Sequence, residues 1–140
     1  MEEPATRPRP DSRGAGKQYW ASAHAGVLTL PKCLSCETAH WYPRLYCPNC
    51  GSDQLEWITC SGKGVIHTFT IVRQSGHPYF RNKVPYVLAM IALDEGVLLM
   101  SNIIECDVDT VRVDARVTVV FEKLGDDVGI PLFKLAGGEK

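Results

Sequence analysis

The stretch CLSCETAHWYPRLYCPNC, residues 33–50, contains two Cys-x-x-Cys pairs separated by ten residues. Two thiolates three positions apart in one tight turn can face the same metal ion, and two such pairs make a tetrahedral four-sulfur site. Zn²⁺ suits such a site best and iron second. Gly51, directly behind the second pair, supplies the positive φ that such a turn requires. The pattern predicts a zinc ribbon with a structural Zn²⁺ and these ligands: Cys33, Cys36, Cys47 and Cys50.

Other arrangements of the four thiols remain open from the sequence. They could form disulfides, lie buried as small apolar side chains, or hold iron as in rubredoxin. The paired spacing is what a metal requires and a disulfide framework does not, so zinc is the preferred interpretation. Cys60 and Cys106 stand outside the pattern and are expected to be ordinary buried or half-buried thiols.

The composition is that of a globular protein. Of the 140 residues, 45% are hydrophobic and 22% are charged, enough for one domain with a small appendage. The chain has no apolar run long enough to span a bilayer. Its first ten residues carry acids and lack the apolar centre of a signal peptide, so we expect a cytoplasmic location.

The region before the cysteines divides into a tail and a short helix. Residues 1–17 hold three of the nine prolines and four basic side chains, which predicts a disordered tail or linker. Residues 18–31 are expected to form a helix over 18–25, ended by Gly26, and an extended lead-in. Tyr19 and Trp20 need a packing partner, which is either the chain's own core or another subunit.

The chain after the ribbon, which we place at 32–60, reads as a mainly β domain over 61–140. β-Branched and apolar runs predict five strands, at 65–72, 86–93, 97–104, 117–121 and 130–135. Asp94-Glu95-Gly96 predicts a hairpin between the second and third. Five strands without a long helix favour a closed OB-fold barrel, although periodicity alone does not exclude an SH3-like barrel.

The connection between the first two barrel strands combines cations with aromatic rings. Such a combination suits a ligand that is anionic at one end and flat or apolar at the other. A solvated loop without a ligand is the simpler alternative. The candidate ligand-binding residues are Arg73, His77, Tyr79, Phe80, Arg81 and Lys83.

Two other functional classes fit the sequence less well. An OB-fold with a zinc ribbon could bind single-stranded nucleic acid, but residues 84–140 carry 5 basic and 10 acidic side chains, and such binding needs a positive groove. For catalysis, the four histidines are scattered and the paired cysteines are assigned to metal. We therefore predict no catalytic residue in this chain.

The motifs together resemble a known family, the zinc-ribbon and OB-fold proteins named domain of unknown function thirty-five. The resemblance covers about 120 residues, from Tyr19-Trp20 to Pro131-Leu132-Phe133. The motifs that carry it are the two cysteine pairs, Pro43-Arg44, Trp57, Ser61-Gly62-Lys63-Gly64, Pro85-Tyr86 and Leu93-Asp94-Glu95-Gly96. Members tend to have a glycine before the fourth barrel strand, where this chain has Asp114-Ala115-Arg116.

The resemblance implies an accessory subunit of a thiolase-like enzyme, in which the partner chain carries the catalytic residues. Such complexes act on acyl-CoA thioesters in thiolase, acyltransferase or retro-aldol reactions, including steroid side-chain cleavage. The expected ligands are therefore a structural Zn²⁺ in this chain and an acyl-CoA in the complex. The expected partner is a thiolase-like protein in a hetero-oligomer, either as a free subunit or as a domain of a longer chain.

Overall fold

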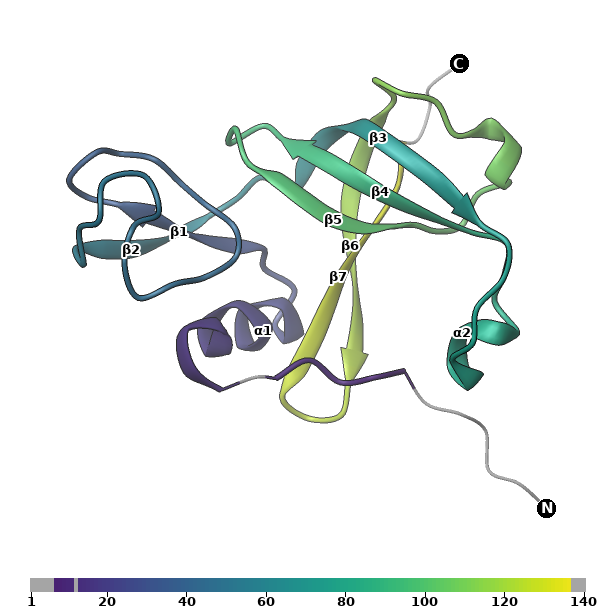
Figure 1. Ribbon diagram of the computed structural model, residues 1–140, viewed down its shortest axis with the longest axis horizontal. Helices are drawn as coiled ribbons and strands as arrows, with labels where there is room; N and C mark the ends of the chain where they lie inside the picture. The colour runs from purple at the N-terminus through teal and green to yellow at the C-terminus, as the bar shows by residue number, and fades with distance from the viewer. Residues whose placement is uncertain (1–6, 12, 137–140) are drawn as a thin grey trace.

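The computed structural model describes residues 7–11 and 13–136. It has a ribbon on one side, a five-stranded barrel on the other, and a helix beneath both (Figure 1). The helix α1 spans Lys17–His24 and follows the short 3₁₀ turn η1, Gly14–Gly16. Gly26 lies just beyond the helix with φ +84°, and its amide donates to the Ala23 carbonyl. The predicted short helix and its glycine end are thus confirmed, with the helix one residue earlier than expected.

The ribbon is built on a two-stranded antiparallel sheet. β1, Thr29–Cys33, leads into the first cysteine pair, and β2, Leu55–Thr59, leaves the second. Their register pairs Cys33 with Leu55 and Thr29 with Thr59, so the sheet closes the base of the cysteine loops.

The barrel is closed in the strand order β3-β4-β5-β7-β6. The strands are β3 Lys63–Val72, β4 Tyr86–Leu93, β5 Leu98–Ile103, β6 Arg116–Leu124 and β7 Val128–Leu135. All neighbouring pairs are antiparallel except β5 and β7, which run parallel. This is the five-stranded OB-fold barrel that the sequence predicts. A second 3₁₀ turn, η2 Val108–Thr110, lies between β5 and β6.

One feature of the barrel differs in detail from the prediction. The loop after β3 contains a short helix, α2, over Pro78–Arg81, where only a polar connection was expected. Pro78 stands in its first turn, and the His77 ring nitrogen Nδ1 accepts a hydrogen bond from the Tyr79 amide at 3.0 Å. The hairpin at Gly96, in contrast, forms as predicted, with the Leu93 amide donating to the Val97 carbonyl.

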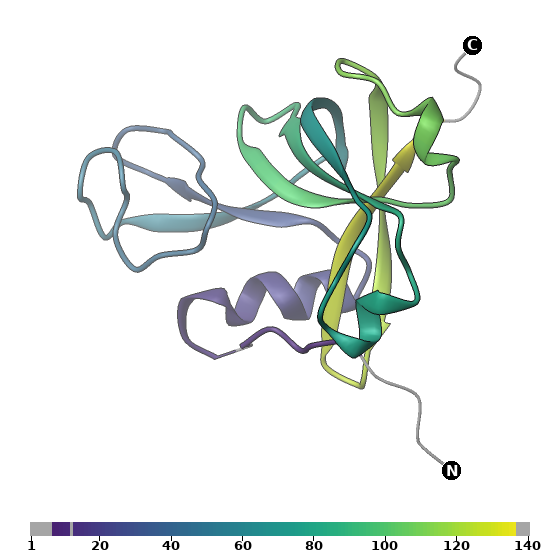
Figure 2. The same ribbon diagram turned by 45° about the vertical axis from the view of Figure 1, so that its right-hand side comes forward.

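Helix α1 packs directly on β7 at Gly129. A side chain at that position would clash with the backbone of Ala23 and His24. Figure 2 shows the same arrangement from another side, with α1 running past the lower part of β7. The glycine therefore fixes how closely the helix approaches the barrel.

The described part of the predicted tail lies against the barrel. The Arg7 Nε atom is 3.1 Å from a carboxylate oxygen of Glu122 in β6, and only 14% of the Arg7 side chain is exposed. Arg9 pairs with Asp127 at 2.9 Å in the β6–β7 turn. Over residues 7–11 the chain thus follows the barrel surface. The rest of the predicted tail, residues 1–6 and 12, lies outside the described residues.

Candidate functional site

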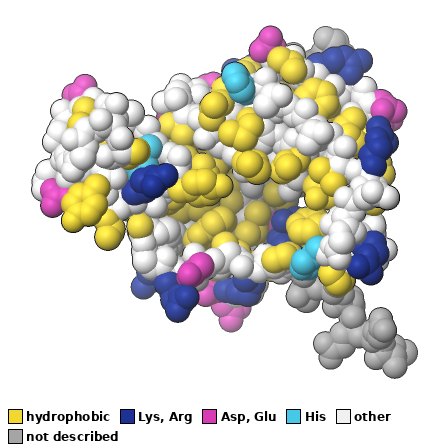
Figure 3. Space-filling view, viewed as in Figure 1, with side chains coloured by type: hydrophobic (Ala, Val, Ile, Leu, Met, Phe, Trp, Pro, Cys, Tyr) yellow, Lys and Arg dark blue, Asp and Glu magenta, His cyan; other side chains and the backbone are white. Residues whose placement is uncertain are grey.

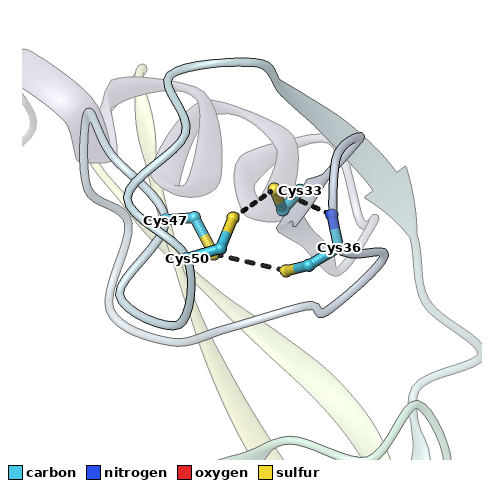
Figure 4. A group of neighbouring side chains, drawn as sticks. All are labelled: Cys33, Cys36, Cys47 and Cys50. Carbon is cyan, nitrogen blue, oxygen red and sulfur yellow. Dashed lines mark hydrogen bonds between the residues drawn. The ribbon is translucent and has the colours of Figure 1, made fainter.

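The two cysteine turns have the same backbone hydrogen-bond pattern. In the first, the Cys33 amide donates to the Thr38 carbonyl and the Glu37 amide donates back to the Cys33 carbonyl. In the second, the Cys47 amide donates to the Ser52 carbonyl and the Gly51 amide donates back to the Cys47 carbonyl. Each turn thereby aims two sulfurs at the space between the loops (Figure 4).

The four sulfurs form one compact group. They lie within 4.8 Å of one another, with 3.5 Å between the sulfurs of Cys33 and Cys50 and 3.7 Å between those of Cys36 and Cys47. A tetrahedral Zn²⁺ with bonds of about 2.3 Å holds its sulfurs about 3.8 Å apart. The residues present therefore fit a four-coordinate zinc ion, with all four positions taken by the chain.

Amide donors around the cage favour thiolates. The Cys33 sulfur accepts from the amides of Cys36 and Ser35, and these bonds lower the pKa of that thiol. The Asn49 side-chain amide, at 3.5 Å, contributes most to lowering the pKa of Cys36 to about 6. For Cys50 the Ser52 amide acts in the same direction, but the neighbouring sulfurs and burial together raise the pKa to about 12. A bound cation would relieve that crowding of sulfurs, as metal binding to thiolates does generally.

The two cysteines outside the cage are held as thiols. Burial raises the pKa of Cys60 to about 12 and also raises that of Cys106. Both are thus poor nucleophiles at neutral pH.

The predicted ligand-binding residues of the loop around α2 lie in two different environments. Arg73 and Arg81 line one hollow of about 480 Å³, where the Arg81 guanidinium donates to the Gly76 carbonyl at 3.0 Å. Tyr79 and Phe80 instead face the tail, where the Arg7 guanidinium lies 5.2 Å and 5.6 Å from their ring centres.

The two remaining candidates in this loop are engaged locally. The Lys83 ammonium lies 4.8 Å from the centre of the Tyr79 ring, a cation–π distance. His77 caps α2 through its ring nitrogen. The structure therefore brings Arg73 and Arg81 together at one hollow of the loop.

Comparisons with known proteins identify the family. Two family models match in succession, the ChsH2 rubredoxin-like zinc ribbon domain over residues 20–56 and the ChsH2 C-terminal OB-fold domain over residues 57–122. A DUF35 domain-containing scaffold protein of Methanothermobacter thermautotrophicus is 35% identical over 101 residues, which cover 71% of this chain and 75% of the relative. The chain belongs to the DUF35 family.

Other relatives extend this picture. The DUF35 scaffold protein of Pyrococcus furiosus is 35% identical over 104 residues, 70% of this chain and 74% of its own. A probable enoyl-CoA hydratase alpha subunit of Thermomonospora curvata is 26% identical over 132 residues; these span 94% of this chain but 41% of that protein.

Solved structures confirm the fold of this DUF35 chain. A chain of the structure titled Ltp2-ChsH2(DUF35) aldolase superposes with a TM-score of 0.81 at 24% identity, over 91% of this chain and 98% of that one. A DUF35 protein from Sulfolobus solfataricus superposes with a TM-score of 0.62 at 16% identity, over 87% of this chain and 85% of that one.

The two neighbouring aromatic residues of α1, Tyr19 and Trp20, differ in burial. Tyr19 is 2% exposed and its ring centre lies 4.1 Å from that of Trp41 in the ribbon. Burial raises the pKa of its hydroxyl. Trp20 is half-buried and packs edge-on against Tyr19 at 4.7 Å. Of the two packing partners left open by the sequence, Tyr19 takes the chain's own core, and it offers little surface to another subunit.

Sequence reasoning missed one position that shapes the DUF35 chain, Gly129, and noted another, Asp114, as a departure from the expected pattern. Gly129 permits the contact between α1 and β7, and its only sequence signal is a glycine inside a strand pattern, which marks a close backbone approach. Asp114, which stands before the fourth barrel strand, takes φ +70°, so the turn forms without a glycine at this position. Aspartate is among the residues that tolerate this left-handed conformation.

Among the residues that the structure describes, no helix is long and apolar enough to cross a membrane.

Proposed function

We propose that this DUF35 chain is an accessory subunit of a thiolase-like enzyme that makes or breaks a carbon–carbon bond of an acyl-CoA. The observation that carries the proposal is the family itself. Relatives of matching length are named scaffold proteins, and the chain superposed over nearly its whole length comes from a structure titled as an aldolase. A retro-aldol cleavage next to the thioester is one reaction of this class.

The chemistry of the chain supports an accessory role. Carbon–carbon bond chemistry beside a thioester needs a positioned base or nucleophile and a stabiliser for the oxyanion. Among the described residues, the cluster of metal-ligating side chains is the cage of four cysteines, whose sulfurs fill a tetrahedral site. A structural Zn²⁺ there would hold the ribbon and leave no position for substrate. We therefore place the reacting groups on the partner.

The α2 loop is the part of the chain that we propose meets the substrate. Its hollow of about 480 Å³ falls within the roughly 300–1,000 Å³ usual for small-molecule sites. Two guanidinium groups at one hollow suit phosphate oxygens, which arginine binds in a bidentate manner. Arg73 and Arg81 would thus hold the anionic end of the acyl-CoA, while the acyl group extends into the partner.

Reconstitution tests the proposed function. The chain and the thiolase-like proteins encoded in the same genome are purified separately and assayed for acyl-CoA turnover, alone and mixed. We expect turnover only in a mixture that also forms a stable complex. Turnover by the isolated chain would overturn the accessory role, and so would full activity of the thiolase-like protein alone.

A further inference from the structure

Strand β4 is apolar on both of its faces. Its inward residues, Val87, Ala89, Ile91 and Leu93, are at most 3% exposed and build the barrel core. The alternate residues, including Leu88 and Met90, point outward and are only partly buried. An antiparallel sheet with one solvated face normally alternates apolar and polar residues. The outer face of β4 therefore has the composition of a covered surface.

Strand β5 continues this surface. Its outward residues Leu98 and Met100 are 43% and 52% exposed. The register places Met90 opposite Met100 and Ala92 opposite Leu98, so these side chains lie next to each other across the two strands. Neither strand contains a charged residue.

Two hollows join over these strands into one surface, which we name the apolar groove. The first, of about 210 Å³, lies toward β3 at Phe69. The second, of about 180 Å³, reaches the aromatic wall of Trp20 and Trp41. Leu88 and Met100 line both. Figure 3 shows hydrophobic side chains gathered around a hollow in the middle of this face.

The charge and side-chain composition of the apolar groove indicate the kind of occupant. Of the described residues that line its two hollows, Arg7 is the one with a charge. Depletion of charge with aromatic and methionine side chains is the composition of an interface core. Exposed apolar patches of this kind mark interaction sites.

The edge of the apolar groove near α2 is formed by Arg7, whose guanidinium pairs with Glu122 at 3.1 Å. Arg7 lies beside Tyr79 and Phe80, and Arg81 and Lys83 belong to the same loop. A complementary protein surface would place an apolar segment over Leu88 and Met100.

We propose that the apolar groove is the docking surface for the thiolase-like partner, which inserts apolar side chains between Met100 and Trp20. This inference rests on the proposed function, because that function supplies the partner. It assigns to Trp20 a place at one end of the interface and to α2 a place near the other.

Paired substitutions at equal exposure test the docking surface. Met100→Glu places a charge in the apolar groove, whereas Val113→Glu places one at a residue that is also 52% exposed and lines neither hollow. The dissociation constant of each purified variant with the thiolase-like protein is measured by calorimetry. We expect Met100→Glu to weaken binding by about tenfold or more. Val113→Glu and Met100→Leu should bind as the unmodified chain does.

The possible outcomes separate the docking surface from the proposed function. Binding by the unmodified chain with an unchanged constant for Met100→Glu would overturn the docking surface and leave the accessory role standing. Failure of the unmodified chain to bind any thiolase-like protein of its genome would overturn both. A concentration-dependent dimer of the isolated chain that Met100→Glu disrupts would assign the apolar groove to a second copy instead. Unchanged circular dichroism of each variant confirms that it is folded.

Discussion

The Cys33 sulfur accepts two backbone hydrogen bonds, from Ser35 at 3.3 Å and from Cys36 at 3.4 Å. The Cys47 sulfur accepts one in the corresponding place, from Asn49 at 3.3 Å. Amide donors of this kind stabilise thiolates and orient them before the metal binds. The cage is thus held by its own turns, and a bound metal would complete it.

Replacing one cysteine ligand should abolish metal binding and unfold the ribbon. Zinc bound to a site of this type contributes about 10–16 kcal/mol in small peptides, which is more than the ribbon's short strands can supply. We expect one zinc per chain by elemental analysis, and none in Cys33→Ser. Cys106→Ser, at a thiol outside the cage, is the matched control and should keep its zinc. Zinc retained in full by Cys33→Ser would contradict the assigned ligands.

At single positions, the sequence predicted the four cysteines of the metal site more fully than it predicted the backbone conformation of the two turns. The spacing of the cysteines defines the cage because the ligand geometry is local to two turns. Gly51 has the expected positive φ of +82°, but the equivalent position of the first turn is Glu37, with φ +65°. A glutamate at this position gives no sequence signal for a positive φ. This conformation follows from the hydrogen bond between the Glu37 amide and the Cys33 carbonyl.

At the scale of elements, the approach of α1 to β7 decides where Trp20 is presented. The helix is only eight residues long and depends on tertiary packing for its stability. Its closest approach is at Gly129, where its backbone occupies the place of a side chain. The position of the aromatic wall beside the apolar groove therefore depends on one missing methyl group.

Adding that methyl group should displace the helix. Gly129→Ala is expected to lower the free energy of unfolding by about 1–3 kcal/mol, because overpacking forces the backbone of α1 away from β7. Chemical denaturation measures this change. Gly76→Ala is the control, since a methyl group there meets nothing within 4 Å. Equal stability of the two variants would mean that α1 adjusts without cost.

The two arginines of the α2 loop give a second prediction at this scale. Replacing Arg73 and Arg81 with alanine should raise the apparent KM for acyl-CoA of the reconstituted enzyme by about tenfold or more, since charge-assisted hydrogen bonds contribute about 1.5–3 kcal/mol each. The matched single change is Lys83→Ala, because the Lys83 ammonium lies over the Tyr79 ring and that residue does not line the hollow. An unchanged KM for the double variant, with normal complex formation, would show that the loop is merely solvated.

The sequence predicted the type of most helices and strands, but it did not predict the contacts between segments that are far apart in the chain. Alternating and β-branched runs define β3 to β7 because strand periodicity is local. The helix α2 was missed because it is four residues long and its cap is a histidine, His77. The contact of Arg7 with Glu122 was missed as well, since it joins residues 115 positions apart in the chain. A proline-rich segment gives no local signal of such a contact.

For the whole molecule, one hydrophobic core joins the three parts. Tyr19 of α1, Leu30 of β1 and Phe133 of β7 belong to the same cluster of buried residues. Trp41 and Trp57 of the ribbon pack against that cluster. Ribbon, helix and barrel are therefore expected to unfold together, although the sequence divides them into separate segments.

Tyr19 is the residue that tests this coupling. Tyr19→Ala removes a ring that is 2% exposed between Trp41 and the barrel core, so it should lower the free energy of unfolding by about 3–5 kcal/mol. The change should appear as one shifted transition when ribbon and barrel are followed separately, by zinc release and by far-ultraviolet circular dichroism. Tyr46→Ala, at a ring that is 60% exposed, should shift neither signal. Two separate transitions, with only zinc release shifted by Tyr19→Ala, would show that the ribbon is an independent unit and that the barrel does not depend on it.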